Sequence, residues 1–289
     1  MNEGTVKSYE QRFNRVLDYI DAHLNEPMSV EQLSKVANFS KFHFHRQFSQ
    51  YTGTTVIAYI RMLRLKRASY RLVFHKHERV IDIALDAGFE TQESFSRAFK
   101  HTYSQSPSQF RNGPKWMPWK EKFCIQPSVR REGMDVTITN FNETKVAKLT
   151  HRGAPELVNN SAMKFIEWRK QSGLSPVTLS QTFGIPYSDP ETIDPEDFTF
   201  DICGSVVREI PEDNVQGVVN GVIPGGRCAI VRHLGSHDQI IVKVRLIFRE
   251  WLPGSGEELR DFPIWFHYQN FFPEVAEHEL ITDIYLPLR

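Results

Sequence analysis

The chain has 289 residues, enough for two domains of ordinary size, and its apolar and charged fractions are typical of a globular protein. No run of about eighteen apolar residues and no charged-then-apolar leader is present, so we expect a cytoplasmic protein without a membrane span. The zero net charge conceals an asymmetry, because residues 1–115 hold 17 Lys and Arg against 11 Asp and Glu, whereas the remainder holds 18 against 24. A basic first half is what contacts with nucleic-acid phosphates require.

The first expected element is a helix over residues 8–24, because apolar residues recur on one face at Phe13, Val16, Leu17 and Ile20. A pair of short helices should follow over residues 29–52. Ser29-Val30-Glu31-Gln32 is a capping box that begins the first of them.

The second helix of this pair should begin after a turn at Asn38-Phe39, with Ser40 as its N-cap. Its spacing places Phe44 and Phe48 inward. The outward positions are Phe42, His45 and Arg46.

A long basic helix is predicted over residues 55–74. Its cationic residues are Arg61, Arg64, Lys66, Arg67 and Arg71. Two interpretations stay open, and they are compatible: a bridge between two DNA-reading motifs, or a structural helix with a solvated basic face.

A second pair of helices is predicted within residues 81–111. Gly88 interrupts the first helix and suits a turn with positive φ, and Thr91 is a candidate N-cap for the next. The inner face of this next helix carries Phe95 and Phe99. Its outer face presents Gln92, Glu93, Ser96 and Arg97.

The two pairs repeat each other, because a shift of 51 residues places Phe44, Arg46 and Phe48 on Phe95, Arg97 and Phe99. Two helices joined by a tight turn, with a polar outer face on the second, form a helix-turn-helix. Its use is to place side chains against base edges in the major groove of double-stranded DNA.

Residues 11–111 resemble the DNA-binding domain of the AraC/XylS family of transcription regulators. The similarity is carried by Ile83-Ala84, Gly88-Phe89, Phe95–Lys100, and Ser106-Pro107 with Phe110-Arg111. The resemblance implies seven helices, two recognition helices that enter successive major grooves, and control of transcription, here expected to be activation with RNA polymerase as a partner. It also implies that Phe42, His45, Arg46, Gln92, Glu93, Ser96 and Arg97 contact DNA, with His45 replacing the glutamine of the family pattern.

We expect three segments: a DNA-binding domain over residues 1–112, a linker with Pro and Trp over residues 113–134, and an effector-binding domain over residues 135–289. In the last of these the periodicity changes to that of strands around one helix, and this order occurs twice. Ala147, His151 and Trp168 recur as Ala229, His233 and Trp251. The overall fold class is therefore multidomain, with an all-α half followed by an α+β half of two β-α-β repeats.

The C-terminal half resembles the GyrI-like small-molecule-binding domain, through Asp201-Ile202-Cys203, Ile223–Gly226 and Thr282–Pro287. The resemblance implies a groove for a small amphipathic ligand. Ligand-binding members carry a glutamate for cationic ligands where this chain has Phe266, which weakens a cationic preference. The candidate pocket residues are aromatic, and each also suits a core: Trp168, Tyr187, Trp251, Trp265, Phe266 and Tyr268.

The C-terminal half has two alternative functions: a hydrolase-like enzyme and a module that only binds another protein. We expect no enzyme and no cofactor, because the chain lacks a nucleophile elbow, a zinc-protease motif, a P-loop and a dinucleotide fingerprint. Cys124, Cys203 and Cys228 are scattered without metal-ligand spacing and are expected to be reduced.

Overall fold

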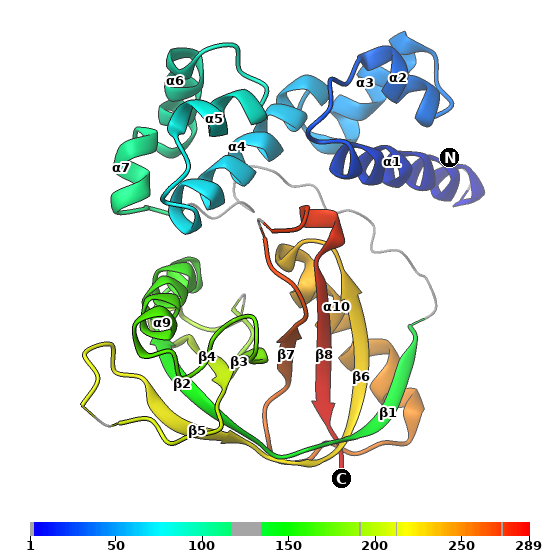
Figure 1. Ribbon diagram of the computed structural model, residues 1–289. Helices are drawn as coiled ribbons and strands as arrows, with labels where there is room; N and C mark the ends of the chain where they lie inside the picture. Colours follow the sequence, from blue (N-terminus) through cyan, green and yellow to red (C-terminus); the bar gives the residue numbers. More distant parts are fainter. Residues whose placement is uncertain (1–2, 117–133, 191, 212, 273) are drawn as a thin grey trace. The chain divides into compact units, whose positions relative to one another are not determined.

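The computed structural model describes residues 3–116, 134–190, 192–211, 213–272 and 274–289, except for the side chains of residues 3–11 and 42. They form two compact units, one mainly within residues 1–130 and one mainly within residues 131–289. The first is helical and the second combines a sheet with helices (Figure 1), which confirms the predicted fold class.

Residues 3–112 of the first unit contain seven helices, the number that the resemblance implies. They are α1 (Glu3–Ala22), α2 (Val30–Val36), α3 (Lys41–Thr52), α4 (Val56–Phe74), α5 (Val80–Asp86), α6 (Gln92–Tyr103) and α7 (Pro107–Asn112). The predicted inner face of α1 is buried, with Val16 and Ile20 fully inaccessible to solvent. These residues pack with Phe44 and Phe48 of α3 in one core.

Helix α4 joins the two helix-turn-helix motifs, as the sequence predicts. It contacts α3 of the first motif, α5 of the second, and α7. Its 19 residues correspond to a length of about 28 Å. The predicted linker lies largely outside the described residues, but Trp116 at its start packs against Tyr70 of α4 and Phe110 of α7.

The second unit contains one eight-stranded antiparallel sheet. Its strands are β1 (Val136–Phe141), β2 (Thr144–Arg152), β3 (Thr182–Pro186), β4 (Thr199–Ser205), β5 (Val219–Ile223), β6 (Gly226–Leu234), β7 (Trp265–Tyr268) and β8 (Ile281–Pro287). Its longer helices are α9 (Val158–Ser172), α10 (Ile240–Leu246), a π-helical segment (Ile247–Trp251) and α11 (Leu252–Ser255).

The strand order is β1-β6-β8-β7-β3-β4-β2-β5. Reading it from the other end and replacing each of β1–β4 by its counterpart in β5–β8, and the reverse, gives the same order. The predicted duplication is therefore present as a pseudo-two-fold arrangement, with β7 and β3 paired at its centre. Each repeat holds four strands around its helix, two more than the β-α-β unit expected from the sequence. The first strand of each repeat is exchanged, because β1 pairs with β6 of the second repeat and β5 pairs with β2 of the first.

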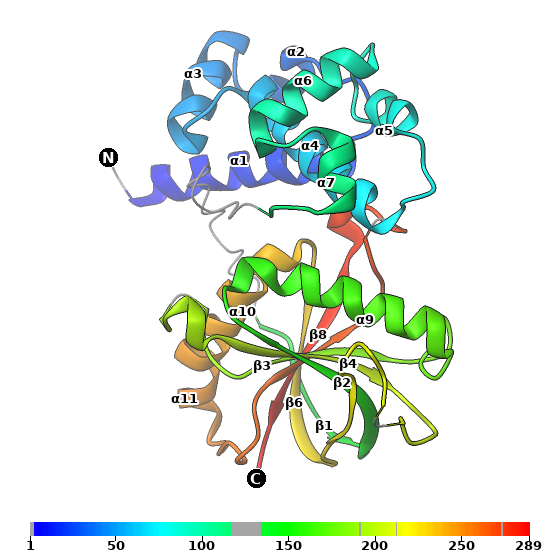
Figure 2. The same cartoon turned by 90° about the vertical axis from the view of Figure 1, so that its left-hand side faces the viewer.

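Helices α9 and α10 cover the same face of the curved sheet, which we call the helix face (Figures 1 and 2). Side chains of β2 and β4 pack with Trp168 of α9 in one core, and side chains of β6 and β8 pack with Val244 of α10 in another. Phe200 of β4 contacts both cores. The opposite face carries a third core around Phe183 and Trp265.

Candidate nucleic-acid interface and ligand face

Both recognition helices begin at the predicted residues. The Ser40 hydroxyl accepts a hydrogen bond from the His43 amide at 3.4 Å, and the Thr91 hydroxyl accepts one from the Ser94 amide at 3.1 Å. Each bond satisfies one of the backbone N–H groups that a helix N-terminus leaves without a partner. The caps therefore fix where α3 and α6 start.

The turns before these helices are alike but differ in length. Asn38 (φ 52°) and Gly88 (φ 77°) take the left-handed conformation at equivalent positions, 50 residues apart. The next residue in each turn, Phe39 or Phe89, donates its amide to a carbonyl of the preceding helix at 2.9 and 3.0 Å. The second turn then contains one more residue, Glu90, which is why the recognition helices are 51 residues apart.

The predicted inner and outer faces of α3 and α6 are observed. Phe44, Phe48, Phe95 and Phe99 are all fully buried. Among the predicted DNA-binding residues, His45, Arg46, Gln92, Glu93 and Arg97 are exposed and Ser96 is half-buried. The side chain of Phe42 lies outside the described residues.

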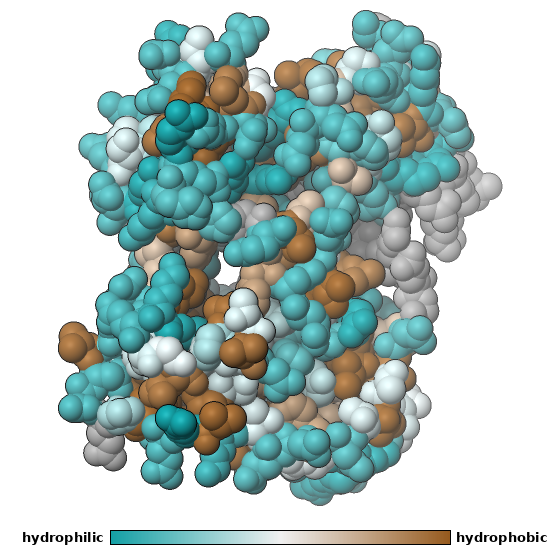
Figure 3. Space-filling model, viewed as in Figure 1, coloured by the Kyte–Doolittle hydropathy of each residue, from teal (hydrophilic) through white to brown (hydrophobic). Residues whose placement is uncertain are grey.

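Arg46 and Arg97 occupy equivalent positions on the two recognition helices. Within the described chain, neither guanidinium makes a hydrogen bond or ion pair with the protein. Arg71 of α4, in contrast, is paired with Glu78 and Asp86. The two outward arginines thus remain available to an external partner, and hydrophilic residues dominate the surface of the first unit visible in Figure 3.

On the helix face, the centre of the sheet is occupied by aromatic rings. A Cβ atom on Gly184 of β3 would lie 2.5 Å from Cζ of Phe200 and 2.7 Å from Oη of Tyr268. Gly184 pairs with Phe266 across β3 and β7. Glycine at this position therefore makes room for two rings that reach the centre from neighbouring strands.

The structure separates the six predicted pocket residues. Phe266 and Tyr268 lie on the helix face in the core below α10, and Trp251 packs against the same core. Trp168 of α9 is buried against the helix face, and Trp265 is buried on the opposite face. Tyr187 is half-exposed and donates its hydroxyl to Asp201 at 2.7 Å.

Two buried carboxylates, Asp201 and Asp283, are equivalent in the two repeats, 82 residues apart. Asp201 accepts a hydrogen bond from Thr150 at 2.6 Å and pairs with Lys148 at 3.1 Å. Asp283 forms two hydrogen bonds with Arg232, at 2.7 and 2.9 Å.

Both carboxylates point away from the helix face, because successive side chains of a strand alternate and Phe200 and Ile284 lie on that face. Asp201, Asp283 and Gly184 were not among the predicted site residues. The repeat spacing of 82 residues is the sequence signal that identifies the two carboxylates as equivalent.

Cys203 and Cys228 are buried free thiols, and burial raises the pKa of both. Cys124 lies outside the described residues. In the described segments, no group of three or more His, Cys, Asp and Glu residues is arranged to hold a metal ion. The helices of those segments include none long and apolar enough to cross a membrane.

Two sequence families match the chain. Residues 134–289 match the GyrI-like small molecule binding domain, and residues 33–113 match a helix-turn-helix domain. The probable transcriptional regulator YgiV of Escherichia coli is 54% identical over 155 residues, which cover 54% of this chain and 96% of that protein. The transcriptional regulator Rob of Salmonella typhimurium is 27% identical over 218 residues, covering 72% of each.

Among solved structures, the EcmrR–DNA complex determined by cryo-electron microscopy is similar with a TM-score of 0.46 and 14% identity. The match covers 91% of this chain and 85% of that one. The curated relatives described here are named as transcriptional regulators and not as enzymes, in agreement with the expectation that the chain is no enzyme.

Proposed function

The chain belongs to the transcription regulators that join an AraC-type helix-turn-helix domain to a GyrI-like domain, and we propose that α3 and α6 read two successive major grooves. The observation that carries this proposal is the equivalence of Arg46 and Arg97. Both are exposed, and neither has a partner within the described protein. A guanidinium in this position forms two parallel hydrogen bonds with a guanine edge.

The test begins with a DNA site selected from random sequence by the full chain. Arg46→Ala and Arg97→Ala should each weaken specific binding by about 1–3 kcal/mol and relax the preference at a different base position. Arg152→Ala is the matched control, because Arg152 is an exposed arginine of the second unit without a partner among the described residues. If either variant binds the selected DNA site with unchanged affinity, the substituted arginine of that helix does not contact the bases.

We propose further that the helix face binds a neutral amphipathic ligand over Phe200, Phe266 and Tyr268. Aromatic rings meet there around Gly184, and the buried carboxylates of the described domain face the other side. A buried cation needs a compensating negative charge, and this face offers none from Asp201 or Asp283.

The ligand proposal is tested by thermal shift of the full chain with neutral, anionic and cationic amphipathic compounds. A compound at about 100 times its dissociation constant adds about 2.7 kcal/mol to stability. Phe266→Glu should move the preference toward cationic compounds, whereas Phe266→Gln should not. Saturable shifts by cationic compounds with the unmodified protein would contradict a neutral ligand.

Activation of transcription through RNA polymerase is the third part of the proposal, supported by family membership. Transcription from a promoter that carries the selected site should increase when the protein is added to purified polymerase, and Arg97→Ala should abolish the increase. A decrease with the unmodified protein would identify a repressor.

If no compound shifts stability, the alternative of a protein-interaction module gains support.

A further inference from the structure

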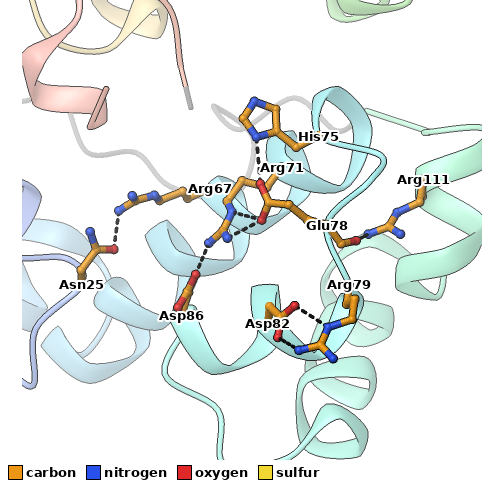
Figure 4. A network of polar contacts seen from close by, with 9 residues as sticks. All are labelled: Asn25, Arg67, Arg71, His75, Glu78, Arg79, Asp82, Asp86 and Arg111. Carbon is orange, nitrogen blue, oxygen red and sulfur yellow. Dashed lines mark hydrogen bonds and ion pairs between the residues drawn. The ribbon is translucent and has the colours of Figure 1, made fainter. Parts of the chain in front are cut away.

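Arginine side chains of α4 lie between the two helix-turn-helix motifs. Arg64, Arg67 and Arg71 are three or four residues apart and therefore share one side of the helix. Figure 4 shows Arg67 directed toward Asn25, in the segment between α1 and α2, and Arg71 directed toward Asp86 of the second motif. The row thus contacts the segment that leads into the first motif on one side and the second motif on the other.

Arg64 holds the backbone of the segment that leads into the first motif. Its Nε donates to the Leu24 carbonyl at 2.9 Å, and its Nη2 donates to the Glu26 carbonyl at 2.7 Å. These carbonyls belong to the segment between α1 and α2. The planar guanidinium is suited to such paired donation, because its N–H groups are fixed in one plane.

The same guanidinium contacts the turn of the second motif. A Cβ atom added to Gly88 would lie 2.4 Å from Nη1 of Arg64, so only a glycine permits this approach. Arg61, one turn earlier on α4, places its guanidinium carbon 5.2 Å from the centre of the Phe89 ring. The turn that precedes α6 is therefore held against α4 by two arginines.

Space remains between the motifs beside these contacts. One cavity of about 370 Å³ is lined by Met28, Ile57 and Phe89 together with Arg64, and another of about 540 Å³ also includes Arg64. Val56, Tyr59 and Ile60 of α4 belong to the buried core of the first motif, and Met62 and Leu63 pack against it. Polar contacts of the α4 arginines thus connect the segment between α1 and α2 with the second motif at this place.

We propose that Arg64 is a positioning residue that fixes the distance and angle between α3 and α6, and thereby the half-site spacing that the protein accepts. This inference rests on the proposed reading of DNA by both helices. Two linked reading helices gain affinity only when their geometry lets both engage at once. A brace that holds this geometry in the free protein also reduces the ordering needed on binding.

The experiment measures binding of the full chain to its selected site and to versions in which the segment between the half-sites is lengthened or shortened by one or two base pairs. Arg64→Ala should weaken binding about tenfold at the original spacing and less at altered spacings. The spacing profile, which is the affinity plotted against half-site spacing, should therefore become flatter. Affinity for a single half-site should not change. Arg64→Lys should resemble Arg64→Ala, because an ammonium retains the charge but not the fixed fork.

Arg79→Ala is the matched control. Arg79 belongs to the same unit, is exposed, and pairs only locally with Asp82 at 2.7 Å (Figure 4). Its removal should leave the spacing profile unchanged. If circular dichroism shows that Arg64→Ala does not fold, the lysine variant decides the question.

Two results would overturn the inference while leaving the proposed function intact. One is a spacing profile of the Arg64 variants identical to that of the unmodified protein. The other is an equal loss of affinity at every spacing with a salt dependence reduced by about one phosphate contact, which would make Arg64 a phosphate ligand. Selection of a site with a single half-site would instead overturn the proposed two-helix reading and this inference with it.

Discussion

Two structural features require a glycine at position 88, the backbone conformation and the close approach of Arg64. Substitutions at Gly88 and Arg64 together can separate their contributions to stability. At Gly88, the φ of 77° disfavours any side chain, and a Cβ atom would lie only 2.4 Å from Nη1 of Arg64. Gly88→Ala should therefore destabilise the N-terminal unit by about 1–2 kcal/mol for the backbone conformation, with an added cost for displacing Arg64. Helix-sensitive circular dichroism in urea measures the loss.

The second part of this cost should vanish in an Arg64→Ala background, because the atom that clashes is then absent. Asn38→Ala is a useful comparison, since Asn38 has the equivalent conformation with a φ of 52°. Equal costs of Gly88→Ala with and without Arg64 would show that the backbone conformation alone demands the glycine.

His233 makes the stability of the second unit depend on pH. The ring is buried, its Nε2 lies 2.9 Å from the Ser236 carbonyl, and burial lowers its pKa below the ordinary value of 6.5. The unfolded chain therefore takes up a proton at a higher pH than the folded chain. This contribution to stability is complete above about pH 6.5 and is lost as the pH falls toward the folded pKa.

We expect His233→Gln to reduce the loss of stability between about pH 7 and about pH 5, because glutamine does not titrate and retains an N–H donor. His101→Gln, which changes an exposed histidine of α6, should leave the slope unchanged. Thermal unfolding across this pH range provides the measurement. Parallel curves for the parent and His233→Gln would assign the acid sensitivity to another group.

At the scale of elements, the exchange of β1 and β5 ties the two repeats together. Each strand completes the other repeat's part of the sheet, so a single repeat would leave an unpaired edge where its partner's strand belongs. Fragments 134–214 and 215–289 should therefore be unfolded when separate and should form the sheet when mixed. Amide dispersion in NMR spectra of each fragment and of the mixture would decide this, and an independently folded fragment would contradict it.

The sequence was sufficient for local structure because caps, turns and inner faces depend on neighbouring residues. Ser40 and Thr91 begin helices as predicted, and Phe44 and Phe95 face inward. Strand exchange was not predictable in this way, because the pairing of β5 with β2 depends on residues far apart in the chain.

The predicted pocket residues show the same limit at the site. Trp265 and Phe266 are adjacent in β7 and so must face opposite sides of the sheet, which an aromatic residue type alone does not reveal. Trp168 and Trp251 are 83 residues apart, whereas other repeated residues are 82 apart. The π-helical segment at Ile247–Trp251 accommodates such an extra residue. The outward arginines Arg46 and Arg97 were predictable because helical periodicity is local.

At the scale of the whole molecule, ligand and DNA must influence each other equally if the second unit regulates the first. A ligand that changes DNA affinity by a given factor requires DNA to change ligand affinity by the same factor. We expect the selected DNA to change the ligand dissociation constant by a factor of about 5 or more, which is the lower end of ordinary allosteric coupling. Ligand titration with and without this DNA measures the factor.

Arg97→Ala supplies the control for this coupling, because it should weaken DNA binding and leave ligand binding in the absence of DNA unchanged. In that variant the effect of DNA on ligand affinity should disappear at DNA concentrations that saturate only the parent. If DNA does not change ligand affinity in the parent although ligand and DNA both bind, the ligand does not act by changing DNA affinity. Regulation would then have to pass through a step after DNA binding, such as the proposed contact with RNA polymerase, because equilibrium linkage admits no one-way effect.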